Sequence, residues 1–111
     1  MKKIKAYRQI NVQGKMFKEL IEGEKVFNDN LLIYTIKSPR TAIIIDIKTG
    51  LSVASASTKV EAMKRFKERE ERYNTIVNDE KYYNKMIKNF NDLDIYVAKV
   101  KEVIKWNYYN Y

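Results

Sequence analysis

The chain has 111 residues, with 22 lysines and arginines against 14 aspartates and glutamates, and it contains neither histidine nor cysteine. Its length fits one domain, 1–111, and its 45% hydrophobic content is sufficient for a core. Without histidine or cysteine the chain cannot build a Cys/His zinc site, a thiol nucleophile, a Ser-His-Asp triad or an imidazole base. This composition favours a protein that binds over one that catalyses, and we expect no cofactor and no metal.

No apolar run approaches the roughly 18 residues of a membrane span. The basic start, MKKIKAYRQI, lacks the apolar stretch of a secretory signal. The absence of cysteine fits a reducing compartment. We therefore expect a cytoplasmic protein without a membrane partner.

Strand patterns occupy most of residues 1–57. Residues 2–13 place Ile4, Ala6 and Ile10 on one parity, which predicts a strand whose apolar face is interrupted by Arg8. Further strands are predicted at 31–36, 41–47 and 51–57, with a turn at 28–30 before the first and turns at 37–40 and 48–50 between them.

Residues 14–23, GKMFKELIEG, have the apolar spacing of a helix rather than that of a strand. Phe17, Leu20 and Ile21 stand at i, i+3 and i+4, and Gly23 suits a left-handed C-terminal cap. This spacing predicts a short helix of about two turns.

Helical signals begin at residue 58. Thr58 and Glu61 form a capping box, and Asp79 and Asp92 can each cap a further helix. The first helix should bury one face, made of Val60, Ala62, Met63, Phe66, Tyr73 and Val77. The chain thus predicts an α+β fold: an antiparallel sheet of about four to five strands in 1–57, then two or three C-terminal helices in 58–111.

The positive charge is concentrated near the N-terminus, because residues 1–40 hold 9 lysines and arginines against 4 acidic residues. A basic surface attracts polyanions. Candidate contacts to phosphates or acidic groups are Lys2, Lys3, Lys5 and Arg40. The alternative is an ordinary lysine-rich solvated surface.

A second basic stripe follows the capping box. Arg65, Arg69 and Arg72 are spaced four and three apart and so line one side of a helix, a geometry suited to phosphates or an acidic partner. The alternative is internal pairing of Glu61 with Arg65 and of Glu68 with Arg72, which would leave Arg69 unpaired.

Aromatic residues are abundant, and the chain ends in alternating aromatic and polar groups. Trp106, Tyr108 and Tyr109 are candidate anchors, because exposed rings stack on single-stranded nucleic acid or fill pockets at protein interfaces. The alternative is that the tail packs back on the sheet.

One segment suggests an enzyme. Residues 43–48, IIIDIK, are similar to the second half of the PD-(D/E)xK nuclease motif, with Asp46 and Lys48 on the same strand face. The resemblance implies a carboxylate that holds Mg²⁺ beside a lysine, completed by an acid such as Asp29, Glu19 or Glu22. The Pro-Asp pair of that family is missing.

The longer block 43–63, IIIDIKTGLSVASASTKVEAM, looks like the hairpin-helix unit of HicB-type antitoxin domains. It lacks the acidic strand and Pro-Gly turn of that family, so antitoxin function is not implied. In size, composition and this block the chain also resembles small proteins carried by phages of Gram-positive bacteria. That resemblance implies a host-takeover protein of the anti-CRISPR inhibitor type, which needs no active site.

The expected function is therefore non-enzymatic binding, in which a phage or mobile-element protein inhibits or occupies a host nucleoprotein complex through basic and aromatic surface. The direct ligand would be protein, RNA or DNA. The alternatives are a small Mg²⁺-dependent nuclease centred on Asp46 and Lys48, and a homodimeric structural protein that pairs through an edge strand.

Overall fold

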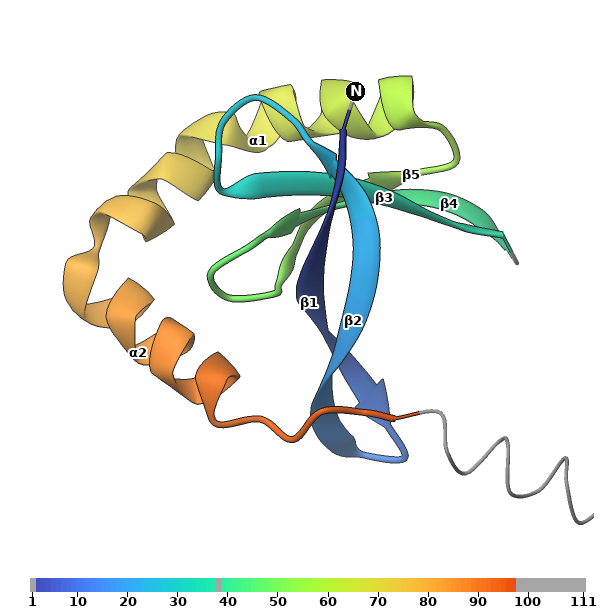
Figure 1. Cartoon of the computed structure of the whole chain (residues 1–111). Coiled ribbons are helices and arrows are strands. Elements are labelled where there is room, and N and C mark those ends of the chain that lie inside the picture. The colour runs from blue at the N-terminus through green and yellow to red at the C-terminus, as the bar shows by residue number, and fades with distance from the viewer. Residues whose placement is uncertain (1, 38, 98–111) are drawn as a thin grey trace, which may run out of the picture.

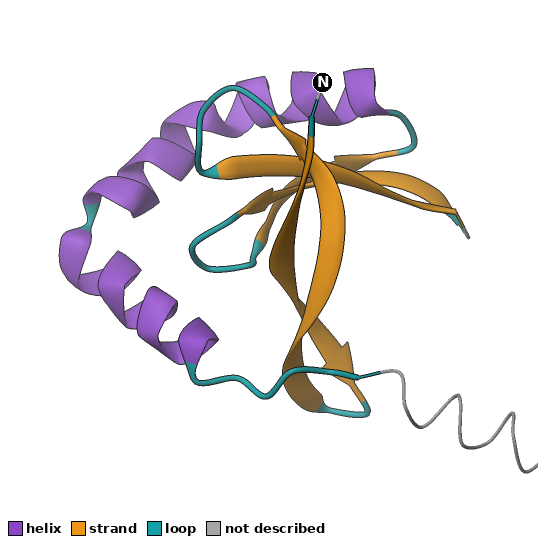
Figure 2. Cartoon of the chain, in the orientation of Figure 1, coloured by secondary structure: helices purple, strands orange, loops and turns teal. Residues whose placement is uncertain are grey.

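The computed structural model describes residues 2–37 and 39–97, in which five antiparallel strands precede two helices (Figures 1 and 2). The elements are β1 (Lys3–Val12), β2 (Lys15–Lys25), β3 (Leu31–Lys37), β4 (Arg40–Asp46), β5 (Ser52–Ala56), α1 (Lys59–Asn78) and α2 (Glu80–Asn91). Each strand pairs with the next, so the sheet order is β1-β2-β3-β4-β5. The predicted α+β class is confirmed.

The helix expected at 14–23 is wrong, because these residues form most of β2. Gln13 and Gly14 have φ angles of 52° and 86°, which suit a tight two-residue hairpin turn between β1 and β2. The apolar side chains of β2 then pair across the hairpin, Phe17 with Ile10 and Ile21 with Ala6. Cross-strand burial therefore outweighs the local helical spacing.

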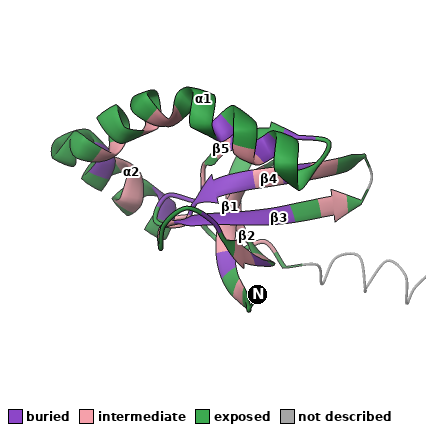
Figure 3. Ribbon diagram, turned by 90° about the horizontal axis from the view of Figure 1, so that it is seen from above, coloured by how far each residue is buried: buried purple, intermediate pink, exposed green. Residues whose placement is uncertain are grey.

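Two apolar layers hold the sheet, one on each face. Leu31, Leu32, Ile33 and Tyr34 are consecutive and all buried, which requires cover on both faces of β3. The layer between α1 and the sheet contains Ala62 and Phe66 from α1 and, facing them, Val26, Leu31, Ile33, Ala42, Ile44, Ala54 and Ala56. The opposite face contains Ala6, Leu32, Tyr34 and Ile45, with Ile4, Ile21, Ile36, Ile43 and Ile47 against them. Figure 3 shows this burial concentrated along β3 and β4.

The cover on the second face is the β1-β2 hairpin, which crosses β3 and β4 (Figure 1). β2 pairs with β3 only through Glu24 and Lys25, so the rest of the hairpin is free to cross the sheet. Gly23 lies where β2 leaves β3, and a Cβ atom there would clash with the carbonyl oxygen of Ile33. A backbone hydrogen bond of 2.9 Å from Gln9 to Gly50 ties β1 to the turn before β5.

The helices start at the predicted caps. Thr58 accepts a hydrogen bond from the amide of Glu61 at 3.2 Å, and Asp79 accepts one from the amide of Tyr82. α1 buries Ala62 and Phe66, but Val60, expected on this apolar face, is 75% exposed. Val60 precedes Ala62 by two residues, which is about 200° around a helix and points it away from the sheet.

The further helix expected after Asp92 does not begin there. Asp92 closes α2, because its amide donates to the carbonyls of Lys88 and Phe90. Residues 93–97 are not helical, and Ile95 instead forms a parallel bridge to Lys18 of β2. The Asp94 carbonyl and the Tyr96 amide form their backbone hydrogen bonds with Lys18, in place of the hydrogen bonds that a helix would provide. The remainder of that predicted helix lies outside the described residues.

Gly23→Ala should destabilise the protein by about 2–3 kcal/mol, because the added methyl group meets backbone that cannot rotate away. Gly14→Ala is the matched control. It meets no atom within 4 Å and only strains a left-handed residue, so it should cost about 1 kcal/mol. Urea unfolding measures both, and a larger loss for Gly14→Ala would contradict the close approach of β2 to β3.

Candidate functional site

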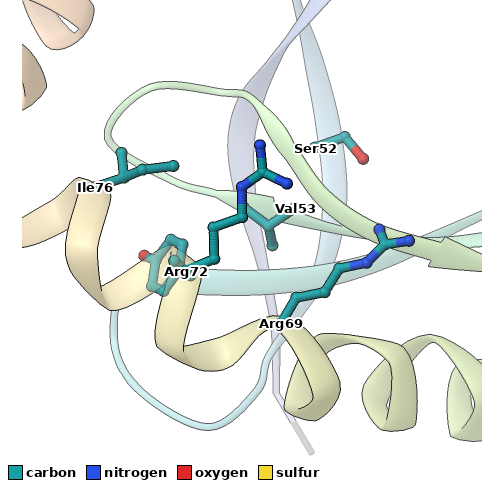
Figure 4. Close-up of a pocket in the computed structure, with 6 residues that line it drawn as sticks. Ser52, Val53, Arg69, Arg72 and Ile76 are labelled. Atoms are coloured by element: carbon teal, nitrogen blue, oxygen red, sulfur yellow. The ribbon is translucent and has the colours of Figure 1, made fainter.

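A groove of about 470 Å³ lies between α1 and β5 (Figure 4). It is lined by Ser52, Val53, Arg69, Arg72, Tyr73 and Ile76. Two arginines and a serine thus line one hollow together with three residues that have apolar or aromatic side chains.

Helix geometry places the arginines there. Phe66 is buried against the sheet, and Arg69, three residues later, lies at the edge of the same helix face. Arg72 follows Arg69 by three residues, and Ile76 follows Arg72 by four. Both therefore continue this edge of the helix along β5. Figure 4 shows both arginine side chains reaching from α1 toward the start of β5, which carries Ser52 and Val53.

The two groove arginines make no salt bridge and no side-chain hydrogen bond to any residue that the structure describes. The alternative pairing of Glu61 with Arg65 and of Glu68 with Arg72 is likewise absent from the described range. Arg65 instead donates to the carbonyl oxygen of Ser55 at 2.9 Å, so the sheet edge holds the first arginine of the stripe.

The groove can therefore receive an anionic group. Each guanidinium presents five N–H donors in a planar fork, which matches carboxylate and phosphate oxygens. The Val53 and Ile76 side chains add apolar wall beside them. None of the residues lining the groove is acidic, so an incoming anion meets no like charge inside it.

The N-terminal candidates lie elsewhere. In the β1-β2 register Lys3 stands opposite Glu24, whose salt bridge of 3.7 Å is with Lys59, and Lys5 stands opposite Glu22. Lys2 is exposed just before β1. Arg40 begins β4, beside a separate hollow of about 250 Å³ under the first turn of α1. Trp106, Tyr108 and Tyr109 lie outside the described residues.

Sequence reasoning missed a second cluster, built around Asp46. This carboxylate is 2% exposed and accepts hydrogen bonds from the Asn30 amide and the Tyr73 hydroxyl. The Tyr83 hydroxyl lies 2.9 Å from both carboxylate oxygens. The Thr49 amide and hydroxyl complete the set at 3.1 and 2.7 Å. The only local signal is Thr49, three residues after Asp46, because the other partners come from distant segments.

This environment keeps both tyrosines protonated. Burial, followed by the hydrogen bond to Asp46 and its negative charge, raises the pKa of Tyr83 to about 12. The same causes raise the pKa of Tyr73 well above its ordinary value. A phenolate at either position would face the carboxylate without a proton between them.

The nuclease alternative draws on the same residues. Both oxygens of Asp46 already accept hydrogen bonds, and the side chains of Asp29 and Glu19 form salt bridges with Lys25 and Arg8. Across residues 2–37 and 39–97, no three acidic residues gather in a way that could hold a metal ion. Lys48 is exposed. Catalysis at Asp46 stays a prediction.

Comparison with protein-family models, with curated proteins and with solved structures finds no match. The described helices are too short or too polar to cross a membrane. The resemblance to antitoxin domains therefore rests on the block 43–63 alone, and the resemblance to phage proteins rests on size, composition and the same block.

The buried tyrosines predict a steep loss of stability at high pH. An unfolded tyrosine releases its proton near pH 10, whereas folded Tyr83 keeps its proton until about pH 12. Between these values the folded state binds more protons, so the free energy of unfolding should fall as pH rises. Urea unfolding followed by circular dichroism across this window measures the slope.

Tyr83→Phe should make that slope shallower, because one titrating group is removed. At neutral pH it should also cost about 1.5–3 kcal/mol, since a hydrogen bond to a charged group is lost. The neighbouring Tyr82 is 54% exposed, so Tyr82→Phe is the matched control and should change neither quantity. An equal effect of both variants would show that Tyr83 does not serve Asp46.

Proposed function

We propose that this protein is a non-enzymatic binding protein whose α1-β5 groove receives an anionic group of a macromolecular partner. The observation that carries the proposal is that Arg69 and Arg72 line a groove without an acidic partner among the described residues. Arginines are enriched at the energetic centres of interfaces, where they bind planar anions through paired hydrogen bonds.

The surroundings of the groove support a binding role. Tyr73, whose ring lines it, is held from below by its hydrogen bond to buried Asp46. Arg65 is held by the Ser55 carbonyl. The Tyr73 ring and the neighbouring Arg65 are therefore held in place before a partner arrives, which lowers the part of the ordering cost of binding that these two side chains would carry.

The identity of the biological partner is a proposal that rests on fewer observations than the groove does. A host nucleoprotein complex of a defence system is what the resemblance to small phage proteins implies, and that resemblance rests on size, composition and residues 43–63. The groove chemistry is compatible with such a partner, because both nucleic acid and acidic protein surfaces present anions.

The double variant Arg69→Glu/Arg72→Glu should weaken partner binding at least about tenfold, the effect of losing about 1.4 kcal/mol. Lys64→Glu/Lys81→Glu is the matched control, because it changes the net charge equally at exposed sites outside the groove. Fluorescence anisotropy with an oligothymidylate and with poly-glutamate as probes measures both. Equal losses in the two variants for both probes would show only diffuse charge attraction and would refute the groove.

A cleavage assay tests the proposal that the protein is not an enzyme. We expect no cleavage of plasmid, single-stranded DNA or RNA in Mg²⁺ or Mn²⁺. Lys48→Ala is the informative variant for the nuclease alternative, because Lys48 is exposed and its loss should leave the fold intact, unlike the loss of buried Asp46. Metal-dependent cleavage that disappears in Lys48→Ala would establish the nuclease instead.

A further inference from the structure

The residues that line the groove indicate what kind of group it binds. This inference makes the proposed function more specific and rests on it. We infer that the groove binds one carboxylate side chain of an extended acidic protein segment, seated between Arg69 and Arg72, with the apolar side chain two residues away against Val53 and Ile76. The anionic partner is then a protein surface rather than a nucleic-acid backbone.

The pattern of charge along α1 favours a single carboxylate. Glu61 lies four residues before Arg65, and Glu68 lies four before Arg72, so the exposed glutamates line the same side of the helix as the arginines. A nucleic-acid strand carries a charge at every nucleotide, about every 3.4 Å in a duplex, and would pass these glutamates on its way along the stripe. A single carboxylate inside the groove meets neither of them.

The apolar part of the groove favours a protein segment. Ile76 is 36% exposed, and with Val53 it offers aliphatic surface beside the guanidinium groups. Phosphate oxygens do not cover such surface, whereas a valine or leucine two positions from an acidic residue does. The ring of Tyr73 is not free to swing out as a stacking platform, because its hydroxyl is bonded to Asp46.

The position of the groove favours an extended segment. β5 is the last strand of the sheet order, so within the described part of the chain no further strand pairs beyond it. Successive side chains of an extended segment point to opposite sides, and those at i and i+2 share a side. A segment lying along β5 can therefore direct a carboxylate and the second-next apolar side chain into the same groove.

The test is an NMR titration of the arginine Nε–Hε signals in the intact protein at physiological ionic strength. The probes are a blocked peptide in which aspartate and valine alternate at every second residue with serine between them (Asp-Ser-Val-Ser, repeated), the same peptide with asparagine for aspartate, and a short oligothymidylate. The signals of Arg69 and Arg72 are assigned with Arg69→Lys and Arg72→Lys. Arg40, outside the groove, is the internal reference.

We expect the acidic peptide to shift the Nε–Hε signals of Arg69 and Arg72 and to leave the signal of Arg40 nearly unchanged. We also expect the asparagine peptide to bind at least about tenfold more weakly. Shifts of these signals by oligothymidylate and not by the acidic peptide would overturn the inference while leaving the proposed anion-binding function in place. Failure of every probe to shift them, together with equal losses in the two charge-reversal variants, would overturn both.

The other occupant to be tested for this groove is a second copy of the chain. Sedimentation velocity on the wild-type protein and on Arg69→Glu/Arg72→Glu decides this. A monomer in both is expected. A dimer that dissociates in the variant would place the protein's own surface in the groove and overturn the inference.

Discussion

The buried carboxylate of Asp46 is the constraint on which the arrangement of the second half of the molecule depends. A charge taken out of water is costly unless donors surround it. The donors here come from the turn before β3, the turn after β4, α1 and α2, so the side chains of Asn30, Thr49, Tyr73 and Tyr83 can solvate Asp46 only when all four segments are in place. No buried side-chain polar atom in the described residues lacks a partner, so the cluster is fully satisfied.

The candidate binding groove is connected to this cluster through a single residue. Tyr73 presents its ring to the groove and its hydroxyl to Asp46. The same turn of α1 carries Arg72, and the preceding turn carries Arg69. Core packing of Phe66 and hydrogen bonding of Tyr73 therefore fix the helix rotation that directs the arginines toward β5.

Net charge alone is a poor guide to where this protein binds. The excess of lysines near the N-terminus is the strongest charge signal in the sequence, yet the β1-β2 register places glutamates opposite Lys3 and Lys5. Arg8 likewise lies opposite Glu19 and bonds both it and the Tyr34 hydroxyl. Arg40 of β4 also makes no salt bridge within the described structure, but Arg69 and Arg72 of α1, where the local charge balance is smaller, are two arginines that line the same groove. Their placement in one groove, rather than charge content, is what distinguishes them.

What the sequence by itself determined is the order of elements wherever the signal is local. The strands at 31–36, 41–47 and 51–57 and the caps at Thr58 and Asp79 were predictable, because turn residues and capping side chains act on backbone a few residues away. The arginine stripe was predictable for the same reason, since residues three and four apart share a helix side.

Tertiary structure decided the rest, because the deciding contacts join residues far apart in the chain. Residues 14–23 have apolar spacing that suits a helix or a strand, and only pairing with β1 selects the strand. The sequence presents Asp46 as the end of a strand with a lysine two residues on, and its role follows from tyrosines 27 and 37 residues away. The groove exists because α1 lies against β5, and no local pattern in the chain encodes that distance or that orientation.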